Sequence, residues 1–202
     1  MKIGIFGGSY NPPHKMHLDI ANQLIEKNYL DKIIFVPTGM KYEYKNNLIE
    51  NEHRYHMIEL MIQNYNNYYV SDYELKEDVV YTYQTMDYYK EKYKEDEIYF
   101  ICGTDNLSYI EKWKRGEYLL ENNKFLVISR DSNELKPILE NLKDYQKNII
   151  VTDVTPMNIS STDIRKWIQE NNIEEAKKYL DEEVLDYILE NNLYKEKLWK
   201  EL

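Results

Sequence analysis

Short apolar runs that are typical of β-strands alternate along the chain with longer segments of helical periodicity. In the first helical segment, Leu18, Ala21 and Ile25 recur at a spacing that places them on one face of a helix. The apolar runs predict strands at residues 2–6, 32–36, 68–71, 98–102, 124–129 and 148–152. Helices are predicted at residues 16–27, 52–64 and 82–92, and further on at about 161–170, 173–179 and 181–191.

Strands that alternate with helices favour parallel pairing through right-handed crossovers, which puts helices on both faces of the sheet. We therefore predict an α/β fold with a Rossmann-like, doubly wound parallel sheet and a helical C-terminal segment. No internal repeat or linker-like stretch divides the chain, so we expect one domain over residues 1–202, with a helical subregion at about 161–202. In such sheets the ligand lies beyond the carboxyl ends of the strands, which points to the loops after Phe6, Val36 and Cys102.

Charge and composition narrow the classes of function. The chain has 26 lysines and arginines against 36 aspartates and glutamates, a net charge of −10, which disfavours nucleic acid and anionic membranes as partners. The lone cysteine, Cys102, excludes an intramolecular disulfide and a cysteine-based zinc site. No apolar stretch has the length of a signal peptide or a membrane helix. We expect a reduced, soluble, cytoplasmic protein, and the sequence leaves open whether it forms a homo-oligomer.

The loop after the first predicted strand gathers residue types that are rare in this chain. Gly7, Gly8 and Ser9 precede two prolines, and His14 and His17 lie where the first helix is expected to begin. Glycines let a backbone approach a ligand and leave N–H groups free to face phosphate, and a helix N-terminus adds partial positive charge. A glycine turn before a helix is common, and two histidines do not complete a zinc site. The whole cluster favours a site for phosphate.

A second segment of this kind follows the last predicted strand, with the sequence ISSTDIR from Ile159 to Arg165. Ser160 and Ser161 are suited to cap a helix and offer hydroxyl and N–H donors. Arg165 comes one helical turn after Ser161, on the same side. A well-capped surface helix would look the same, so the segment gains its meaning from occurring together with the first one.

The two segments resemble the signatures of the nucleotidyltransferase superfamily, and most closely those of bacterial nicotinate-nucleotide adenylyltransferases. The first is similar to GG[TS]FDPPHxGH, with Tyr10, Asn11 and Met16 in place of Phe, Asp and Gly, and the second is similar to ISSTxIR. The resemblance implies that His14 and His17 are catalytic, contacting the ATP phosphates and stabilising charge as the α-phosphorus is attacked. The ATP-binding residues that it implies, including a GxD loop, are Gly7, Gly8, Ser9, His17, Gly103, Asp105, Ile159, Ser160, Ser161 and Arg165.

Further matches imply a binding site for a mononucleotide. The expected residues are Tyr81, Thr82, Trp113, Arg130, Lys41 and Lys45. The tyrosine–threonine pair resembles one that meets the nicotinate carboxylate, the tryptophan resembles one that stacks on the nicotinate ring, and the arginine resembles one that faces phosphate. The family's Pro-His-Lys element has no counterpart after Pro37, so one of the two lysines is expected to supply the missing cation.

The implied reaction transfers the adenylyl group of ATP to nicotinate mononucleotide, giving nicotinate adenine dinucleotide and pyrophosphate in NAD biosynthesis. Mg²⁺ is expected to arrive with the ATP phosphates rather than in a metal site of the protein. Alternatives are an adenylyltransferase with nicotinamide mononucleotide or phosphopantetheine as acceptor, and a non-catalytic nucleotide-binding module. Phosphopantetheine enzymes typically have Thr at the position of His14. The two histidines together with Ser160, Ser161 and Arg165 argue against the non-catalytic module.

Overall fold

The predicted strands form one parallel sheet in the computed structural model of the chain, which describes residues 1–39, 48–76, 79–129 and 131–195. Within these ranges the sheet has six strands in the order β3-β2-β1-β4-β5-β6. Their bounds are Lys2–Gly8 (β1), Lys32–Pro37 (β2), Tyr68–Val70 (β3), Glu97–Gly103 (β4), Lys124–Ile128 (β5) and Ile149–Val151 (β6). The strand order reverses direction between β1 and β4, and ligands bind at such reversal points in open α/β sheets.

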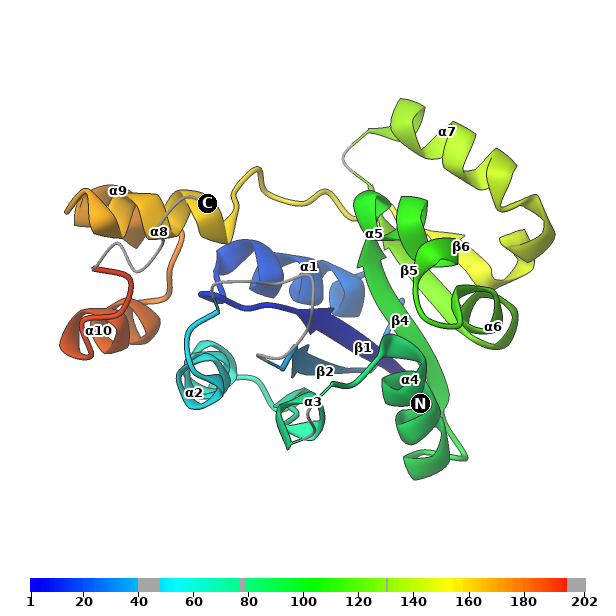
Figure 1. The fold of residues 1–202 in the computed structure, drawn as a ribbon, viewed down its shortest axis with the longest axis horizontal. Helices are drawn as coiled ribbons and strands as arrows, with labels where there is room; N and C mark the ends of the chain where they lie inside the picture. The colour runs from blue at the N-terminus through cyan, green and yellow to red at the C-terminus, as the bar shows by residue number, and fades with distance from the viewer. Residues whose placement is uncertain (40–47, 77–78, 130, 196–202) are drawn as a thin grey trace.

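Helices cover both faces of this sheet (Figure 1). The longer ones are α1 (Lys15–Glu26), α2 (Asn51–Ile62), α4 (Thr82–Lys92), α7 (Ser132–Asn141), α8 (Ser161–Gln169) and α10 (Glu182–Glu190). The shorter ones are α3 (Tyr73–Lys76), α5 (Thr104–Tyr109), α6 (Gly116–Asn122) and α9 (Ile173–Lys177), with 3₁₀ turns at Ile110–Lys112 and Lys143–Asn148. Figure 1 shows α8–α10 gathered at one end of the molecule and α5–α7 at the other.

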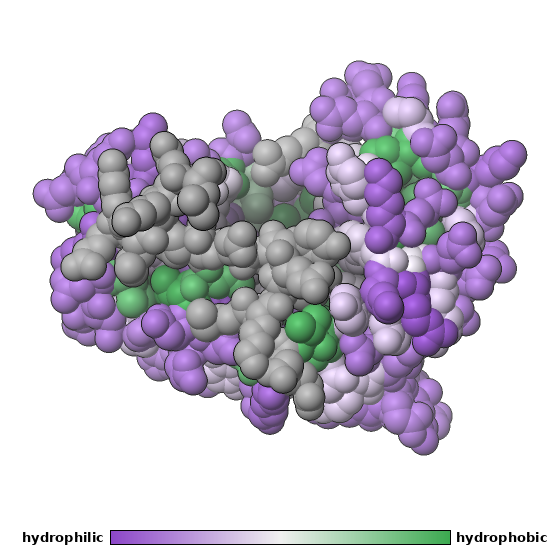
Figure 2. Space-filling model, viewed as in Figure 1, coloured by the Kyte–Doolittle hydropathy of each residue, from purple (hydrophilic) through white to green (hydrophobic). Residues whose placement is uncertain are grey.

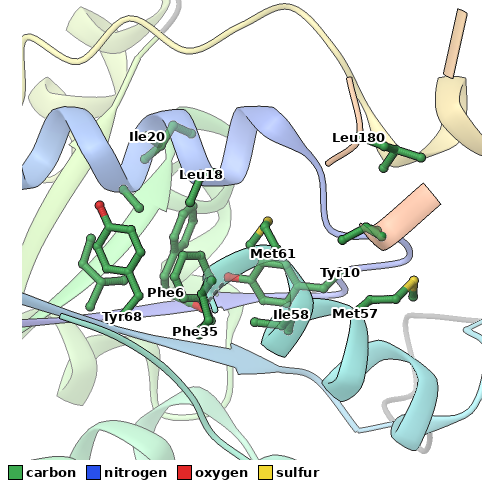
Figure 3. Packing of buried hydrophobic residues seen from close by; sticks show 14 of the residues in the cluster. Phe6, Tyr10, Leu18, Ile20, Phe35, Met57, Ile58, Met61, Tyr68 and Leu180 are labelled. Atoms are coloured by element: carbon green, nitrogen blue, oxygen red, sulfur yellow. Dashed lines mark hydrogen bonds between the residues drawn. The ribbon is translucent and has the colours of Figure 1, made fainter. Parts of the chain in front are cut away.

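Alternation along the strands produces two separate hydrophobic clusters, one on each face. In β2, Ile33 and Phe35 pack with α1, α2 and the C-terminal helices, whereas Ile34 and Val36 pack with α4–α6 on the other face. Figure 3 shows the first cluster, in which the side chains of α1 and α2 meet around Phe35. A strand buried on both faces reads as a continuous apolar run, which explains why these strands are recognisable in the sequence.

The predicted fold class is confirmed, and the errors concern local structure. The sequence prediction missed the short helices α3, α5 and α6 and the helix α7. Helix α4 begins at Thr82, and the residue at its N-cap is Tyr81. Met16, which replaces a glycine of the resembling signature, packs against the first cluster.

The surface agrees with the strongly charged composition of the chain. Hydrophilic side chains dominate the rim of the face shown in Figure 2. No helix within the described ranges is long and apolar enough to cross a lipid bilayer.

Candidate functional site

The two histidines of the first segment lie against each other at the start of α1. The ring centroids of His14 and His17 are 4.0 Å apart. The backbone N–H of His14 donates a hydrogen bond to Nδ1 of His17 across 3.1 Å, so the neutral His17 ring carries its proton on Nε2. This leaves the Nε2–H of His17 as a donor at the N-terminus of a helix, where phosphate is favoured.

Burial keeps both imidazoles neutral at physiological pH. Burial and the neighbouring His17 ring lower the pKa of His14 to about 2, and burial lowers the pKa of His17 to about 4 although its bond to the His14 backbone opposes the shift. The Nδ1 atom of His14 is buried, and among the described residues it has no hydrogen-bond partner. The histidine pair therefore offers hydrogen-bond donors and partial charge rather than two fixed cations, and a bound phosphate would raise both pKa values.

Side chains of α8 hold the loop that leads to these histidines. Ser161 Oγ donates to the carbonyl oxygen of Pro12 across 2.9 Å, and Arg165 Nη1 donates to the carbonyl oxygen of Asn11 across 2.8 Å. Ser160 caps the helix as expected, because its Oγ accepts a hydrogen bond from the backbone N–H of Asp163. The two sequence segments are thus joined directly, and the N-terminus of α8 lies beside the histidine loop.

A cavity of about 840 Å³ lies next to the histidine loop, at the carboxyl ends of β1 and β2. Its lining includes Gly7 and Gly8 at the end of β1, Tyr81 and Thr82 at the start of α4, and Trp113. The Trp113 ring meets the ring of Phe100 edge-on at 6.2 Å, which fixes its orientation in the wall. The predicted mononucleotide residues of the described ranges therefore share one cavity of a size suited to a nucleotide-sized ligand.

Gly7 and Gly8 connect this cavity with the histidine loop. A Cβ atom built on Gly8 would lie 3.1 Å from the Tyr10 ring, so the glycine allows the loop to fold back closely on itself. Tyr10 lies in the left-handed region with a φ of 47°, and its hydroxyl donates to the carbonyl oxygen of Phe6. The tyrosine in place of the signature's phenylalanine thus adds a hydrogen bond inside the loop.

The remaining predicted residues are placed less centrally. Gly103 ends β4 and is the N-cap of α5, and the side chain of Asp105 is exposed in the first turn of α5. Ile159 buries its side chain in the first hydrophobic cluster, which leaves only its backbone for a ligand. Three predicted cations, Lys41, Lys45 and Arg130, lie outside the described residues.

The sequence prediction missed several residues of the cavity wall. Glu74 and Thr85 line it, and the Thr85 hydroxyl donates to Glu74 Oε1 across 2.6 Å in a buried position. Arg115 also lines it, with its guanidinium 4.1 Å from the ring centroid of Tyr118 and 5.0 Å from that of Tyr83. Arg115 follows the predicted site residue Trp113 by two positions, and this proximity could have indicated it. No local pattern marks Glu74 or Thr85.

Other kinds of chemistry receive no support from the described residues. Burial raises the pKa of the Cys102 thiol to about 12, so this cysteine is not an activated nucleophile. Within the described ranges, no group of three or more His, Cys, Asp or Glu side chains comes together in a way that could hold a metal ion. The polar groups at the histidine loop are mainly nitrogen donors and hydroxyls, which suit phosphate oxygens.

A doubly wound parallel sheet with a histidine pair and a second helix N-terminus at its reversal point defines a class of nucleotidyltransferases. The chain belongs to the cytidylyltransferase-like family, which it matches over residues 5–167. Within this class the sequence relatives are more specific. A Clostridium acetobutylicum protein named "Probable nicotinate-nucleotide adenylyltransferase" is 36% identical over 199 residues, covering 96% of this chain and 98% of that protein. The chain is thus a member of the nicotinate-nucleotide adenylyltransferase group of this family.

Solved structures agree with this assignment. The fold is similar to that of Plasmodium falciparum nicotinic acid mononucleotide adenylyltransferase complexed with NaAD, with a TM-score of 0.82 and 27% identity. That match covers 96% of this chain and 97% of the other. The same Plasmodium falciparum enzyme complexed with APC gives a TM-score of 0.79 at 27% identity, covering 96% of each chain.

Proposed function

We propose that the protein transfers the adenylyl group of ATP to nicotinate mononucleotide, forming nicotinate adenine dinucleotide and releasing pyrophosphate. The observation that carries this proposal is the position of Gly7 and Gly8. They line a nucleotide-sized cavity and also lead into the loop that presents donors for phosphate. The names of the relatives and the NaAD complex of the Plasmodium falciparum enzyme support the choice of acceptor.

In the proposed reaction, a phosphate oxygen of the mononucleotide attacks the α-phosphorus of ATP. A new P–O bond to the adenylyl group forms while the bond from the α-phosphorus to the bridging oxygen breaks, and pyrophosphate leaves in line. The attacking phosphate is already ionised at neutral pH, so no general base is needed. Catalysis then depends on positioning and on stabilising the charge that develops around the transferred group.

Each part of the site has a proposed role in this scheme. His17 donates Nε2–H to a phosphate oxygen, His14 lies beside it, and the N-terminus of α8 at Ser160 and Ser161 adds backbone N–H donors. The cavity would hold the mononucleotide, with Trp113 against the ring and the start of α4 at Thr82 near its carboxylate.

The remaining parts of the proposal concern ATP, the magnesium ion that accompanies it, and the location and partners of the protein. No group of three or more His, Cys, Asp or Glu side chains in the described part of the chain could hold a metal ion, so we propose that Mg²⁺ enters as the ATP complex and is treated as part of that substrate. The predicted residues Gly103 and Asp105 at the end of β4 are proposed to face the ribose and adenine. The cytoplasmic location and the lack of nucleic-acid and membrane partners stay predictions.

A pyrophosphate-release assay with ATP and Mg²⁺ tests the proposal. Nicotinate mononucleotide, nicotinamide mononucleotide and phosphopantetheine are offered as acceptors in parallel, and the product is identified by chromatography. We expect the highest kcat/KM with nicotinate mononucleotide. Turnover with phosphopantetheine alone would overturn the acceptor assignment, and no turnover with any acceptor would favour a non-catalytic nucleotide-binding module.

A further inference from the structure

Tyr194, close to the C-terminal end of the described chain, reaches into the histidine loop. Its side chain is buried, and its hydroxyl donates a hydrogen bond to Oδ1 of Asn11 across 3.0 Å. Burial raises the pKa of the Tyr194 hydroxyl far above its usual value, so the group is a donor at physiological pH. The residue has a φ of 65°, in the left-handed region that a tyrosine seldom adopts. The chain thus accepts an unfavourable backbone conformation where this contact is made.

Asn11 is held at both its side chain and its main chain. Its Oδ1 accepts from the hydroxyl of Tyr194 and, at 3.4 Å, from the backbone N–H of Ile49, while its carbonyl oxygen accepts from Arg165. Because the side-chain contacts fix the amide and the main-chain contact fixes the peptide, Asn11 has little freedom to rotate. Three residues later the chain reaches His14, so the direction in which α1 begins depends on how Asn11 is held.

The neutral amide at position 11 suits this arrangement. The family signature that this loop resembles has Asp at this position. Asn11 instead carries no charge in a loop that we propose receives the ATP phosphates. An amide oxygen accepts the Tyr194 hydrogen bond without adding a negative charge close to those phosphates. The tyrosine and the asparagine therefore form a matched neutral pair.

From these contacts we propose that Tyr194 is a positioning residue for adenylyl transfer, acting through Asn11 on the histidine pair. The inference rests on the proposed function. A purely structural role, in which Tyr194 only docks the C-terminal helices, is the competing explanation. The chain offers a matched control for it, because the hydroxyl of Tyr187 in α10 also joins the C-terminal region to the rest of the chain, through a 2.8 Å hydrogen bond to His53 Nδ1 on α2, away from the loop.

The test compares Tyr194→Phe with Tyr187→Phe in the full-length protein. We expect Tyr194→Phe to lower kcat about tenfold with less than about a twofold change in the KM of the mononucleotide, since small misplacements of catalytic groups are costly. Tyr187→Phe is expected to leave kcat within about twofold of wild type. In an Asn11→Ala background, Tyr194→Phe should have no further effect on kcat, because the two residues act as one unit.

Two results would overturn the proposal. One is an unchanged kcat in Tyr194→Phe, with or without a lower melting temperature, and the other is an equal loss of kcat in Tyr187→Phe. Calorimetric titration with a non-hydrolysable ATP analogue distinguishes a failure of the positioning role from a failure of the proposed function. If the wild-type protein makes no dinucleotide, the proposed reaction is wrong. The positioning role then still requires the analogue to bind about fivefold more weakly to Tyr194→Phe than to Tyr187→Phe. Equal binding to the two variants would reject the positioning role.

Discussion

The guanidinium of Arg54 donates a hydrogen bond to the carbonyl oxygen of Ser9 across 2.8 Å, from a position with no exposure to solvent. Nε of the same side chain donates to the carbonyl oxygen of Ile49, and Nη2 donates to Oδ1 of Asn51. Burial lowers the pKa of Arg54 to about 10, which still leaves it charged at physiological pH. The loop after β1 is thus fixed from α2 as well as from α8.

Arg54→Lys is expected to destabilise the protein. A lysine keeps the charge, but one ammonium group cannot serve three acceptors that the planar guanidinium reaches together. Losing most of these charge-assisted hydrogen bonds should lower the free energy of unfolding by about 3 kcal/mol. Urea denaturation followed by circular dichroism measures it, with Arg115→Lys as the control at an exposed arginine. Equal stability of the two variants would show that the Arg54 contacts contribute nothing specific.

The free energy of unfolding should fall as the pH is lowered from 6.5 towards 4. The pKa of His17 is about 4 in the folded chain against an ordinary value of 6.5, so in this window the unfolded chain binds more protons and is favoured. After allowance for the partial exposure of its side chain, His17 should account for about 2 kcal/mol of this fall in the free energy of unfolding. Urea titrations at several pH values should give a shallower pH dependence of the free energy of unfolding for His17→Asn than for wild type, and an unchanged dependence would show that His17 does not contribute to it.

His17→Asn should also reduce the rate of adenylyl transfer. An asparagine can accept the hydrogen bond from the His14 backbone, but it lacks the more distant Nε2–H donor. Removing one donor that stabilises developing charge costs about a hundredfold in kcat. The pyrophosphate-release assay measures this loss, and the melting temperature shows whether folding is preserved. Near wild-type activity would rule out a charge-stabilising role for this histidine.

Trp113→Ala should weaken binding of the mononucleotide and leave ATP unaffected. Stacking of an aromatic ring on a base is worth about 1–3 kcal/mol, so the KM of the mononucleotide should rise about tenfold. Trp113→Phe should recover part of this loss because it restores an aromatic face. The control is Trp167→Phe, which alters a tryptophan stacked on Tyr179 in the C-terminal region. A parallel rise in the KM of ATP would place Trp113 elsewhere in the site.

The predictability of the fold follows from how its strands are buried. β1, β2, β4 and β5 are covered on both faces, and such strands read as continuous apolar runs. Helix α6 escaped notice because it is short and begins at Gly116, directly after Arg115 in a left-handed conformation. Tertiary contacts rather than local propensity place helices of this length.

The residues of the candidate site also differ in how far the sequence predicts them. His14, Ser161 and Arg165 lie in contiguous segments whose residue types already indicate phosphate, and the structure joins those segments by hydrogen bonds. Arg54 holds the same loop from α2 through its contact with Ser9, 45 residues earlier in the chain. The part played by Tyr194 could not be read from the sequence, because it depends on a contact with a residue 183 positions away.

The hydrogen bonds from α8 to the histidine loop have a consequence for synthesis of the protein. Ser161 and Arg165 follow their partners Pro12 and Asn11 by 149 and 154 residues, so the ribosome makes the loop long before it makes the donors. All six strands also precede Ser161 in the chain, so the strands are synthesised before either donor. Nucleotide affinity should therefore arise late in translation, once α8 can reach the loop, and chains terminated before Ser161 should lack a working site.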